Sequence, residues 1–261
     1  YLRRLTMPKI SILMAVHNPN MDYFHECLNA IENQTFQDFE LIIIDDQTTT
    51  CIIEDILNQY SFSYKIIKNT HNLGLAKSLN RGLEICNGEY IARMDDDDIM
   101  YENRLQEQYS YSLNHNGFIF CDVDIIDLEG KIIKSSLKNN INIKEYLKKS
   151  GNCLTHSSLF VKKQILEELG GYDERFIYAQ DYALYMKAID KYEFYNINKS
   201  LVKYRLPIVR NSKMKKILSL LSCYAAFVYY VSQNKNIKNL FFYFRRSLSL
   251  IKLLLNYIID K

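Results

Sequence analysis

Four consecutive aspartates, Asp95 to Asp98, are the residues of this sequence with the clearest chemical potential. Adjacent carboxylates repel one another, so such a cluster is tolerated where a cation or hydrogen-bond donors compensate its charge. A hard cation such as Mg²⁺ binds through one or two carboxylates together with the phosphates of a substrate. The cluster therefore indicates metal-assisted chemistry on a phosphate-containing substrate. From charge alone, a solvated acidic loop or an adventitious calcium site is the alternative.

A further carboxylate, Asp181, lies at the start of a helical pattern much later in the chain. Taken alone, it is an aspartate that favours the positive end of a helix.

The elements that position these residues follow from the order of apolar runs and helical patterns. In the first hundred residues this alternation predicts βα units around a parallel sheet. The expected strands are residues 9–16, 39–44, 64–68 and 90–94, and the expected helices are residues 22–34, 51–60 and 75–85. Ligands bind beyond the carboxyl ends of such strands, so the loops after these strands are expected to line one crevice.

The later part of the body extends this sheet. We expect a helix over residues 101–114, an antiparallel pair within 118–133 with its turn at 127–130, a strand over 157–161, and helices over 163–169 and from residue 180 onward. The predicted fold is therefore α/β, with a mixed sheet flanked by helices and a C-terminal helical tail. The expected divisions are a leader or added residues at 1–7, one domain at 8–210, and the tail at 211–261.

Two stretches carry a family resemblance: Asn72-Leu-Gly-Leu-Ala-Lys-Ser-Leu-Asn, and the run from Gly88 through the four aspartates. Together they resemble glycosyltransferase family 2, the inverting enzymes with the Rossmann-like GT-A fold, over about residues 8 to 206. The family commonly has Met-Asp-Ala-Asp-Asp here. The resemblance implies that Asp97 and Asp95 coordinate Mn²⁺ or Mg²⁺, that Asp95 also holds the ribose and diphosphate, and that Asp96 is a peripheral member of the nucleotide-sugar site.

Two earlier loops are similar to the parts of the family that bind the nucleotide. The first strand ends in His17 and Asn18, with His17 where the family more often has tyrosine. The second strand leads into Asp45 and Asp46, followed by Gln47 where glycine is usual. The resemblance implies that the two aspartates, His17 and Asn18 contact the nucleotide. An Asp-Asp pair after a strand is weak evidence when taken alone, because such pairs often cap turns.

The segment from Gly170 to Leu184 is similar to the family's Gly-Tyr-Asp-Glu stretch and the Glu-Asp-Tyr-Asp-Leu run that follows it. Gln180 and Ala183 depart from that pattern. By this match Asp181 is the general base. In an inverting transfer, the acceptor hydroxyl attacks the anomeric carbon opposite the leaving phosphate, and the base accepts its proton.

Several other polar residues are candidates for contacts with phosphate or acceptor. Lys77 is expected at the donor phosphates, and His156 and Arg205 at the diphosphate or the acceptor, with Arg81 and Arg93 as further cations in reach of phosphate. A solvated cation, or for His156 a structural histidine, is the alternative in each case.

The net charge of +3 over 261 residues conceals an acidic body and a basic tail. From residue 213 onward there are nine Lys or Arg and one acidic residue. The apolar stretch 217–231 is too short to span a bilayer, while 240–259 forms a basic amphipathic pattern suited to an anionic membrane surface. Packing of the tail on the body or on a second subunit is the alternative, and oligomeric state stays open. Scattered cysteines favour a reducing cytosol.

These features favour an inverting, metal-dependent glycosyltransferase with a nucleotide-diphosphate donor, most simply a UDP-sugar. Its expected acceptor is a glycan or a lipid-diphosphate-linked sugar in bacterial surface polysaccharide synthesis, O-antigen or capsule, at the cytoplasmic face of the plasma membrane. No nucleic-acid partner is expected. One alternative, a nucleotidyltransferase, would have a glycine-rich phosphate loop after the first strand, where this chain has Ala15-Val-His-Asn-Pro-Asn. The other alternative is a non-catalytic membrane-associated scaffold that retains the fold.

Overall fold

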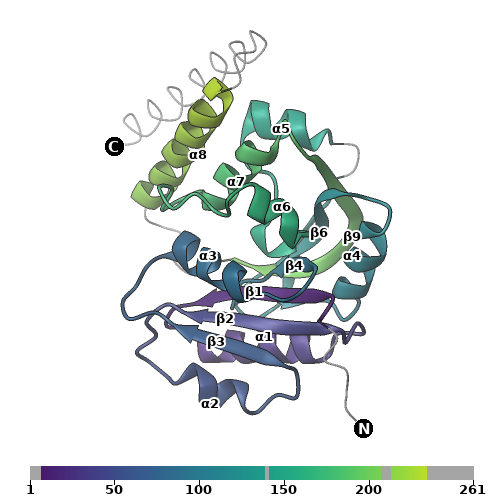
Figure 1. Ribbon diagram of the computed structural model, residues 1–261, viewed down its shortest axis with the longest axis vertical. Helices are drawn as coiled ribbons and strands as arrows, with labels where there is room; N and C mark the ends of the chain where they lie inside the picture. The colour runs from purple at the N-terminus through teal and green to yellow at the C-terminus, as the bar shows by residue number, and fades with distance from the viewer. Residues whose placement is uncertain (1–6, 139–140, 207–212, 234–261) are drawn as a thin grey trace. The chain divides into compact units, whose positions relative to one another are not determined.

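A computed structural model describes residues 7–138, 141–206 and 213–233 (Figure 1). The chain forms two compact units. The first contains Tyr1–Asn139, Leu154–Gly171 and Tyr192–Ile208, and the second contains Asn140–Cys153, Tyr172–Lys191 and Val209–Lys261. Each unit is thus assembled from segments that are separated in the sequence.

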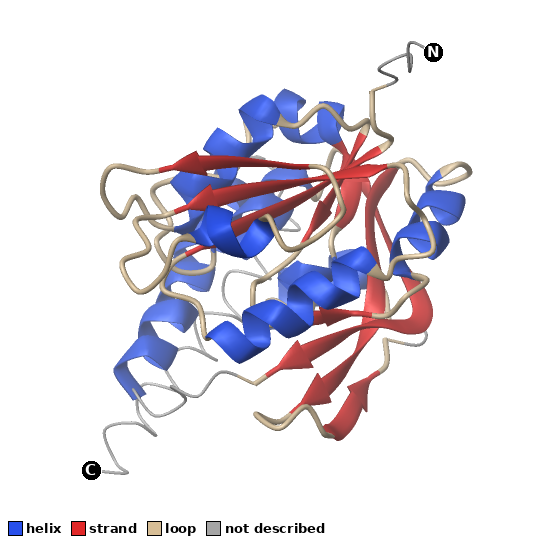
Figure 2. Cartoon of the chain, turned by 90° about the horizontal axis from the view of Figure 1, so that it is seen from below, coloured by secondary structure: helices blue, strands red, loops and turns tan. Residues whose placement is uncertain are grey.

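The first unit is built on a mixed sheet (Figure 2). Its strands are β1 (Ile10–Val16), β2 (Phe39–Asp45), β3 (Tyr64–Lys68), β4 (Tyr90–Arg93), β5 (Ile99–Met100), β6 (Gly117–Ile126), β7 (Ile132–Ser136), β8 (Phe160–Lys162) and β9 (Glu193–Arg205). The order across the sheet is β3-β2-β1-β4-β8-β6-β9-β5, and β7 pairs with β6. The first four strands are parallel to one another, and β8 joins them in the antiparallel direction.

Helices cover both faces of the parallel strands, as the uninterrupted apolar runs require. Helix α1 (Met21–Glu32) packs its apolar side against one face. Helix α3 (Leu75–Ile85) lies on the other face, where a side chain at Gly82 would collide with Leu13 and Ile44. The two helices can be followed on opposite sides of β1 and β2 in Figure 1. The remaining helical segments of this unit are α2 (Ile53–Leu57), α4 (Arg104–Ser112), the 3₁₀ turn η1 (His156–Ser158) and α6 (Lys163–Glu168).

The predicted α/β fold is confirmed, and the parallel half agrees with the expected elements. Three elements were not predicted: the two-residue strand β5, the long strand β9, and helix α5 (Ile143–Ser150). The strand expected over 157–161 begins instead as the 3₁₀ turn η1, and only β8 is extended.

The second unit consists of helices α5, α7 (Gln180–Ala188) and α8 (Lys213–Gln233). Helix α8, the described part of the predicted tail, packs on α7. It also holds the loop before α7, because the Tyr230 hydroxyl donates to Asp173 Oδ2 at 2.5 Å and the Arg175 guanidinium lies 4.3 Å from the Tyr229 ring centroid. The predicted second tail helix, 240–259, lies outside the described residues. Across the described part of the chain, no helix combines the length and apolarity needed to cross a membrane.

Glu40 on β2 provides a test of the sheet's buried polar contacts. It is 4% exposed and accepts hydrogen bonds from Ser11 Oγ at 2.7 Å, Asn87 N at 2.6 Å and Lys65 Nζ at 2.8 Å. Burial alone would raise the pKa of Glu40, but these donors outweigh it and the pKa is lowered. A lowered folded-state pKa means that the ionised carboxylate stabilises the fold above the ordinary glutamate pKa, and that this stabilisation is lost as pH falls through the folded-state value.

We therefore expect Glu40→Gln to lower the free energy of unfolding by about 1–3 kcal/mol at neutral pH, and by less in acid, below the ordinary glutamate pKa of about 4.3. Urea unfolding at both pH values measures this difference. Glu89→Gln, which removes the exposed partner of Lys9 at 3.7 Å, is the matched control and should change stability by less than about 1 kcal/mol. An equal loss for Glu40→Gln at both pH values would contradict the explanation.

Candidate active site

The loop after β4 carries the four aspartates, and two of them are held by neighbouring side chains. Asp95 Oδ1 pairs with the buried Arg93 guanidinium, and its Oδ2 accepts a hydrogen bond from Ser157 Oγ at 2.7 Å. The Ser157 hydroxyl also contacts Asp98 Oδ2. Asp98 is fully buried, and its Oδ1 accepts the backbone N–H of Arg205 at 2.8 Å. Asp98 is therefore an anchor of the loop, and Asp95 is fixed in direction.

The pKa values of the four carboxyls diverge according to these partners. Burial alone would raise the pKa of Asp95, but the Arg93 charge lowers it. Burial together with Asp95 and Asp97 raises the pKa of Asp98 well above its usual range. Burial and the neighbouring carboxylates also raise the pKa of Asp96 to about 7 and that of Asp97 to about 6. Among the residues that the structure describes, no side chain donates a hydrogen bond to the carboxylate of Asp96 or Asp97, whereas those of Asp95 and Asp98 both accept one from Ser157.

His156 lies directly before the serine that bridges the loop. Burial and the charge of Arg93 lower its pKa well below the usual range, against the opposing effect of Asp95. The imidazole is therefore neutral at physiological pH, which is the form that can accept a hydrogen bond or coordinate a metal. The predicted contact with diphosphate or acceptor stays a prediction.

The donor set at this loop fits a hard divalent cation. Its free oxygens are carboxylates, which suit Mg²⁺ and Mn²⁺ better than soft metals. The raised pKa values of Asp96 and Asp97 show that burial and neighbouring carboxylates disfavour their ionised forms, which a bound cation would stabilise. Within the described ranges, no three His, Cys, Asp or Glu side chains already form a metal-binding group. The fit is therefore to a cation held by one or two carboxylates together with substrate phosphates, as is usual for Mg²⁺.

The loop after β1 presents the predicted nucleotide contacts His17 and Asn18 at the surface. The His17 ring nitrogen Nδ1 lies 2.7 Å from the carbonyl oxygen of Asp46, and Asn18 Oδ1 accepts the Thr49 N–H at 2.8 Å. The ends of β1 and β2 are thus joined by hydrogen bonds at the carboxyl edge of the sheet, and the crevice expected there stays a prediction.

Asp45 and Asp46 are buried and serve the loops themselves. Asp45 Oδ1 accepts the Thr48 N–H at 2.7 Å, so it closes the turn after β2. Asp46 accepts from donors in the 69–74 loop: Asn69 Nδ2 at 2.7 Å, Leu73 N at 2.7 Å and Gly74 N at 2.9 Å. Burial would raise the pKa of Asp46, but these hydrogen bonds lower it. Asp45 and Asp46 therefore shape the loops, and their direct contact with the nucleotide stays a prediction.

Backbone strain marks the same places. Three described residues other than glycine have positive φ: Asn18 at 48°, Gln47 at 64° and Ala179 at 60°. Each is a predicted site residue or lies within two residues of one, and such conformations are concentrated at functional sites. The Gln47 backbone keeps a left-handed conformation suited to glycine, the residue usual here in the resembling family. Its Oε1 accepts the Asn72 N–H at 2.9 Å, so the substituted side chain supports the adjacent loop.

The predicted cations have different surroundings. Lys77 is exposed in the first turn of α3, at the end of that helix where Gly74 contacts Asp46. Arg81 donates to Asn69 Oδ1, and Arg93 is buried against Asp95. Arg205, predicted at the diphosphate or acceptor, is 2% exposed and donates to the carbonyl oxygens of Asp97 and Leu128. Of these four cations, only Lys77 is exposed.

Asp181 belongs to the second unit and lies in the first turn of α7. Its carboxylate accepts Asn152 Nδ2 at 2.6 Å and the Tyr182 N–H at 2.7 Å. The preceding Ala179 is the left-handed residue that begins the helix. The carboxylate is therefore oriented by two donors and is only partly buried, which suits a general base.

Two functional contacts were missed by sequence analysis. Arg93 was considered only as a phosphate contact, although it lies two residues before Asp95, a spacing that in an extended strand places both on one face. That signal was available. Ser157 comes from a distant segment, and no pattern in the sequence pointed to its position between Asp95 and Asp98.

Sequence comparison identifies relatives across most of the chain. The family described as glycosyl transferase family 2 matches residues 11–191. An uncharacterised glycosyltransferase of Methanocaldococcus jannaschii is 36% identical over 219 residues, covering 80% of this chain and 75% of that protein. The O-antigen biosynthesis glycosyltransferase WbnJ of Escherichia coli is 32% identical over 228 residues, covering 85% of this chain and 87% of that protein.

Solved structures agree on the fold. The Pyrobaculum calidifontis mannosyltransferase PcManGT, solved with GDP-Man and Mn²⁺, has a TM-score of 0.71 at 15% identity, covering 94% of this chain and 70% of that chain. S. aureus TarS 1–349, solved with UDP, has a TM-score of 0.64 at 18% identity, covering 84% of this chain. This chain spans 65% of the TarS 1–349 chain, less than two thirds of its length.

Proposed function

Because this chain belongs to glycosyl transferase family 2, we propose that this glycosyltransferase moves a sugar, with inversion and with a divalent cation, from a nucleotide-diphosphate donor to an acceptor hydroxyl. We further propose a UDP-sugar as donor. The proposed acceptor is a glycan or lipid-diphosphate-linked sugar in bacterial surface polysaccharide synthesis, O-antigen or capsule. WbnJ acts in O-antigen biosynthesis and a further relative, AmsE, in amylovoran biosynthesis by their names, which supports this class of product.

The observation that carries the proposal is that neighbouring side chains bind some of the four aspartate carboxylates and not the others. Arg93 and Ser157 hold Asp95, and Ser157 and the Arg205 N–H hold the buried Asp98, while no described side chain donates to the carboxylate of Asp96 or Asp97. This arrangement provides a fixed carboxylate beside one that a cation can bind, at the end of a strand adjacent to β1. A diphosphate brought there by the β1 and β2 loops would complete the ligands of the cation.

In the proposed reaction, Asp97 and Asp95 would hold Mn²⁺ or Mg²⁺, which would supply positive charge beside the leaving diphosphate. His17 and Asn18 hold the nucleotide with the loops that Asp45 and Asp46 shape. Asp96 and Lys77 contribute at the edge of the nucleotide-sugar site, and His156 at the diphosphate or acceptor. The acceptor oxygen forms a bond to the anomeric carbon while the bond from that carbon to the phosphate oxygen breaks. Asp181 accepts the hydroxyl proton, and the nucleoside diphosphate leaves.

Turnover of a panel of nucleotide sugars tests this proposal. Purified full-length protein is assayed with UDP-, GDP- and TDP-sugars, with Mn²⁺, with Mg²⁺ and with EDTA. We expect release of one nucleoside diphosphate that depends on the cation and is increased by a glycan or lipid-linked acceptor. Equal rates with EDTA and with Mn²⁺ would contradict the metal dependence, and no release from any donor would contradict the transfer itself.

We also propose that the tail holds the protein at the inner face of the bacterial plasma membrane. Its sequence is strongly basic, and each basic residue near an anionic surface contributes about 1 kcal/mol. Because α8 packs on α7, the test keeps α8 and removes only the residues after it, so the full chain is compared with a chain ending at Gln233.

The affinity of the protein for phosphatidylglycerol vesicles is measured by sedimentation. The full chain should bind at least about tenfold more tightly than the shortened chain, and high salt should abolish this difference. Phosphatidylcholine vesicles are the control for charge. Equal binding of the two chains to anionic vesicles would contradict the membrane proposal.

Neither alternative considered from the sequence is favoured by an observation. The family match is to glycosyltransferases and not to nucleotidyltransferases. A scaffold without activity gives no reason for a partly exposed Asp181 held by two hydrogen-bond donors.

A further inference from the structure

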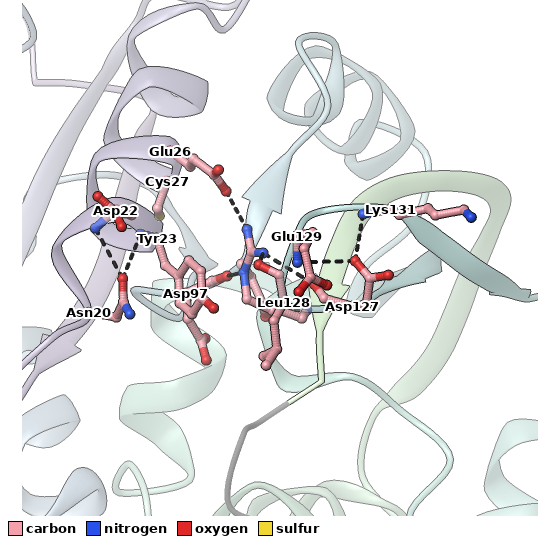
Figure 3. A network of polar contacts seen from close by, with 12 residues as sticks. Asn20, Asp22, Tyr23, Glu26, Cys27, Asp97, Asp127, Leu128, Glu129 and Lys131 are labelled. Carbon is pink, nitrogen blue, oxygen red and sulfur yellow. Dashed lines mark hydrogen bonds and ion pairs between the residues drawn. The ribbon is translucent and has the colours of Figure 1, made fainter.

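The side chain of Arg205, at the end of β9, donates to three parts of the first unit: the aspartate loop, helix α1 and the β6–β7 turn. Figure 3 labels its partners Glu26, Asp97, Asp127 and Leu128. Its Nε donates to the Asp97 carbonyl oxygen at 3.0 Å, and its Nη2 donates to Glu26 on α1. Its Nη1 donates to the carbonyl oxygens of Asp127, at 3.2 Å, and Leu128, at 2.9 Å, in the turn between β6 and β7. Four of the five N–H groups of a guanidinium are thereby used within the protein.

Both sides of this arrangement are themselves fixed. The β6–β7 turn is closed by Asp127, whose Oδ1 accepts the Lys131 N–H at 2.8 Å. Helix α1 is capped by Asn20, and its Tyr23 ring lies 4.1 Å from the guanidinium carbon of Arg205. Arg205 is therefore held by structured elements on both sides, and not by mobile side chains alone.

These contacts of Arg205 hold the backbone at Asp97. Arg205 holds the Asp97 carbonyl through Nε, and its backbone N–H holds the carboxylate of the next residue, Asp98. With the peptide and the following side chain both held, the position of the Asp97 backbone, from which its carboxylate extends, is held as well. Through Glu26 and Tyr23, the same guanidinium joins this loop to the helix that directly follows the nucleotide loop of His17 and Asn18.

We infer that Arg205 is a positioning residue that sets Asp97 at a constant distance from the nucleotide loop, and that it does not contact the diphosphate. The inference rests on the proposed function, because it assigns to Asp97 the cation that accompanies the donor. It replaces the direct role considered from the sequence, for which the guanidinium has one N–H left. Removal of such indirect support typically lowers metal affinity by about 10-fold to 100-fold.

Two variants separate positioning from direct contact: Arg205→Lys, which cannot reproduce the forked contacts, and Glu26→Gln, which removes the charge of its partner. Glu107→Gln, which loses an exposed ion pair with Lys199 at 2.6 Å, is the matched control. Calorimetry measures UDP and GDP affinity in EDTA, then the Mn²⁺ concentration at half-maximal enhancement of that affinity. Thermal unfolding of each variant is measured in parallel.

Positioning predicts that both variants raise the Mn²⁺ midpoint by about 10-fold or more, while affinity in EDTA changes by less than about twofold and the control changes neither. Direct contact with the diphosphate predicts that Arg205→Lys lowers nucleotide affinity in EDTA, while Glu26→Gln keeps the nucleotide affinity and the Mn²⁺ midpoint of the wild type. This result overturns the inference. A lower unfolding temperature with an unchanged Mn²⁺ midpoint overturns it too. Because the Glu26 side chain is 48% exposed, that variant should fold even if Arg205→Lys does not.

The wild-type measurement distinguishes a failure of the proposed function from a failure of this inference. A wild type whose nucleotide affinity does not respond to Mn²⁺ contradicts the proposed metal-dependent function and the inference with it. A wild type that responds, with variants that respond at the same Mn²⁺ concentration, overturns only the role of Arg205.

Discussion

Replacing Asp97 with asparagine is expected to lower the rate of sugar transfer by at least about a hundredfold and to abolish the response of nucleotide binding to Mn²⁺. The physical reason is the loss of a charged ligand. No described side chain donates a hydrogen bond to the Asp97 carboxylate, and burial and the nearby Asp95 raise its pKa to about 6 despite the charges of Arg93 and Arg205. An amide of the same size cannot offset the charge of a divalent cation.

Steady-state turnover and calorimetry with and without Mn²⁺ measure this effect. Asp55→Asn is the matched control, because Asp55 is an exposed residue of α2 away from the aspartate loop. Asp96→Asn should have a smaller effect than Asp97→Asn, since Asp96 is expected at the periphery. If Asp96→Asn is the more damaging of the two, the cation is held by a different pair of carboxylates.

The second large effect is expected at Asp181. Asp181→Asn should lower turnover by about 10² to 10⁴-fold while nucleotide affinity stays within about twofold of the wild type, because a general base acts on the acceptor and not on the donor. The substitution keeps the size of the side chain and one acceptor oxygen, so only one of the two donors, Asn152 Nδ2 or the Tyr182 N–H, loses its acceptor, at a partly exposed position. A loss of folding is therefore not expected.

Nucleotide release and nucleotide binding are measured on the same preparation, and unfolding temperature checks the fold. Asp190→Asn, which removes the carboxylate that Lys148 contacts at 2.7 Å in the same unit, is the matched control and should keep full activity. Transfer by Asp181→Asn at the wild-type rate would show that the proton is taken by another group.

The parallel half of the fold could be predicted because strands buried on both faces have unbroken apolar sequences. Residues 41–44 of β2 form an unbroken apolar run, and each such run is followed by an amphipathic helix. Strand β9 has no such apolar run. Its middle contains Asn196, Asn198 and Lys199, which are uncommon in strands, and its register with β6 shifts near Asp122. Long-range pairing with β6 overrides these local preferences.

The candidate site divides in the same way. Residues at strand ends, such as Asp97 and Asn18, could be predicted because topology alone brings the ends of parallel strands together. The side chains that surround each carboxylate could not be predicted from the sequence. Whether an aspartate lies beside Arg93, Ser157 or open space depends on contacts between segments far apart in the sequence, and these contacts decide which carboxylate keeps an uncompensated charge.

The place of β9 in the sheet has a consequence for synthesis of the protein on the ribosome. β9 lies between β6 and β5, and its last residue is Arg205. The nascent chain can pair β1 to β4 early, but the sheet stays open until about 205 residues have emerged from the ribosome exit tunnel. During that interval β6 exposes an unpaired edge, which favours association with other chains or with chaperones. The aspartate loop is locked only at the end of translation of this domain, so premature termination before β9 should yield an aggregation-prone fragment and not a smaller active enzyme.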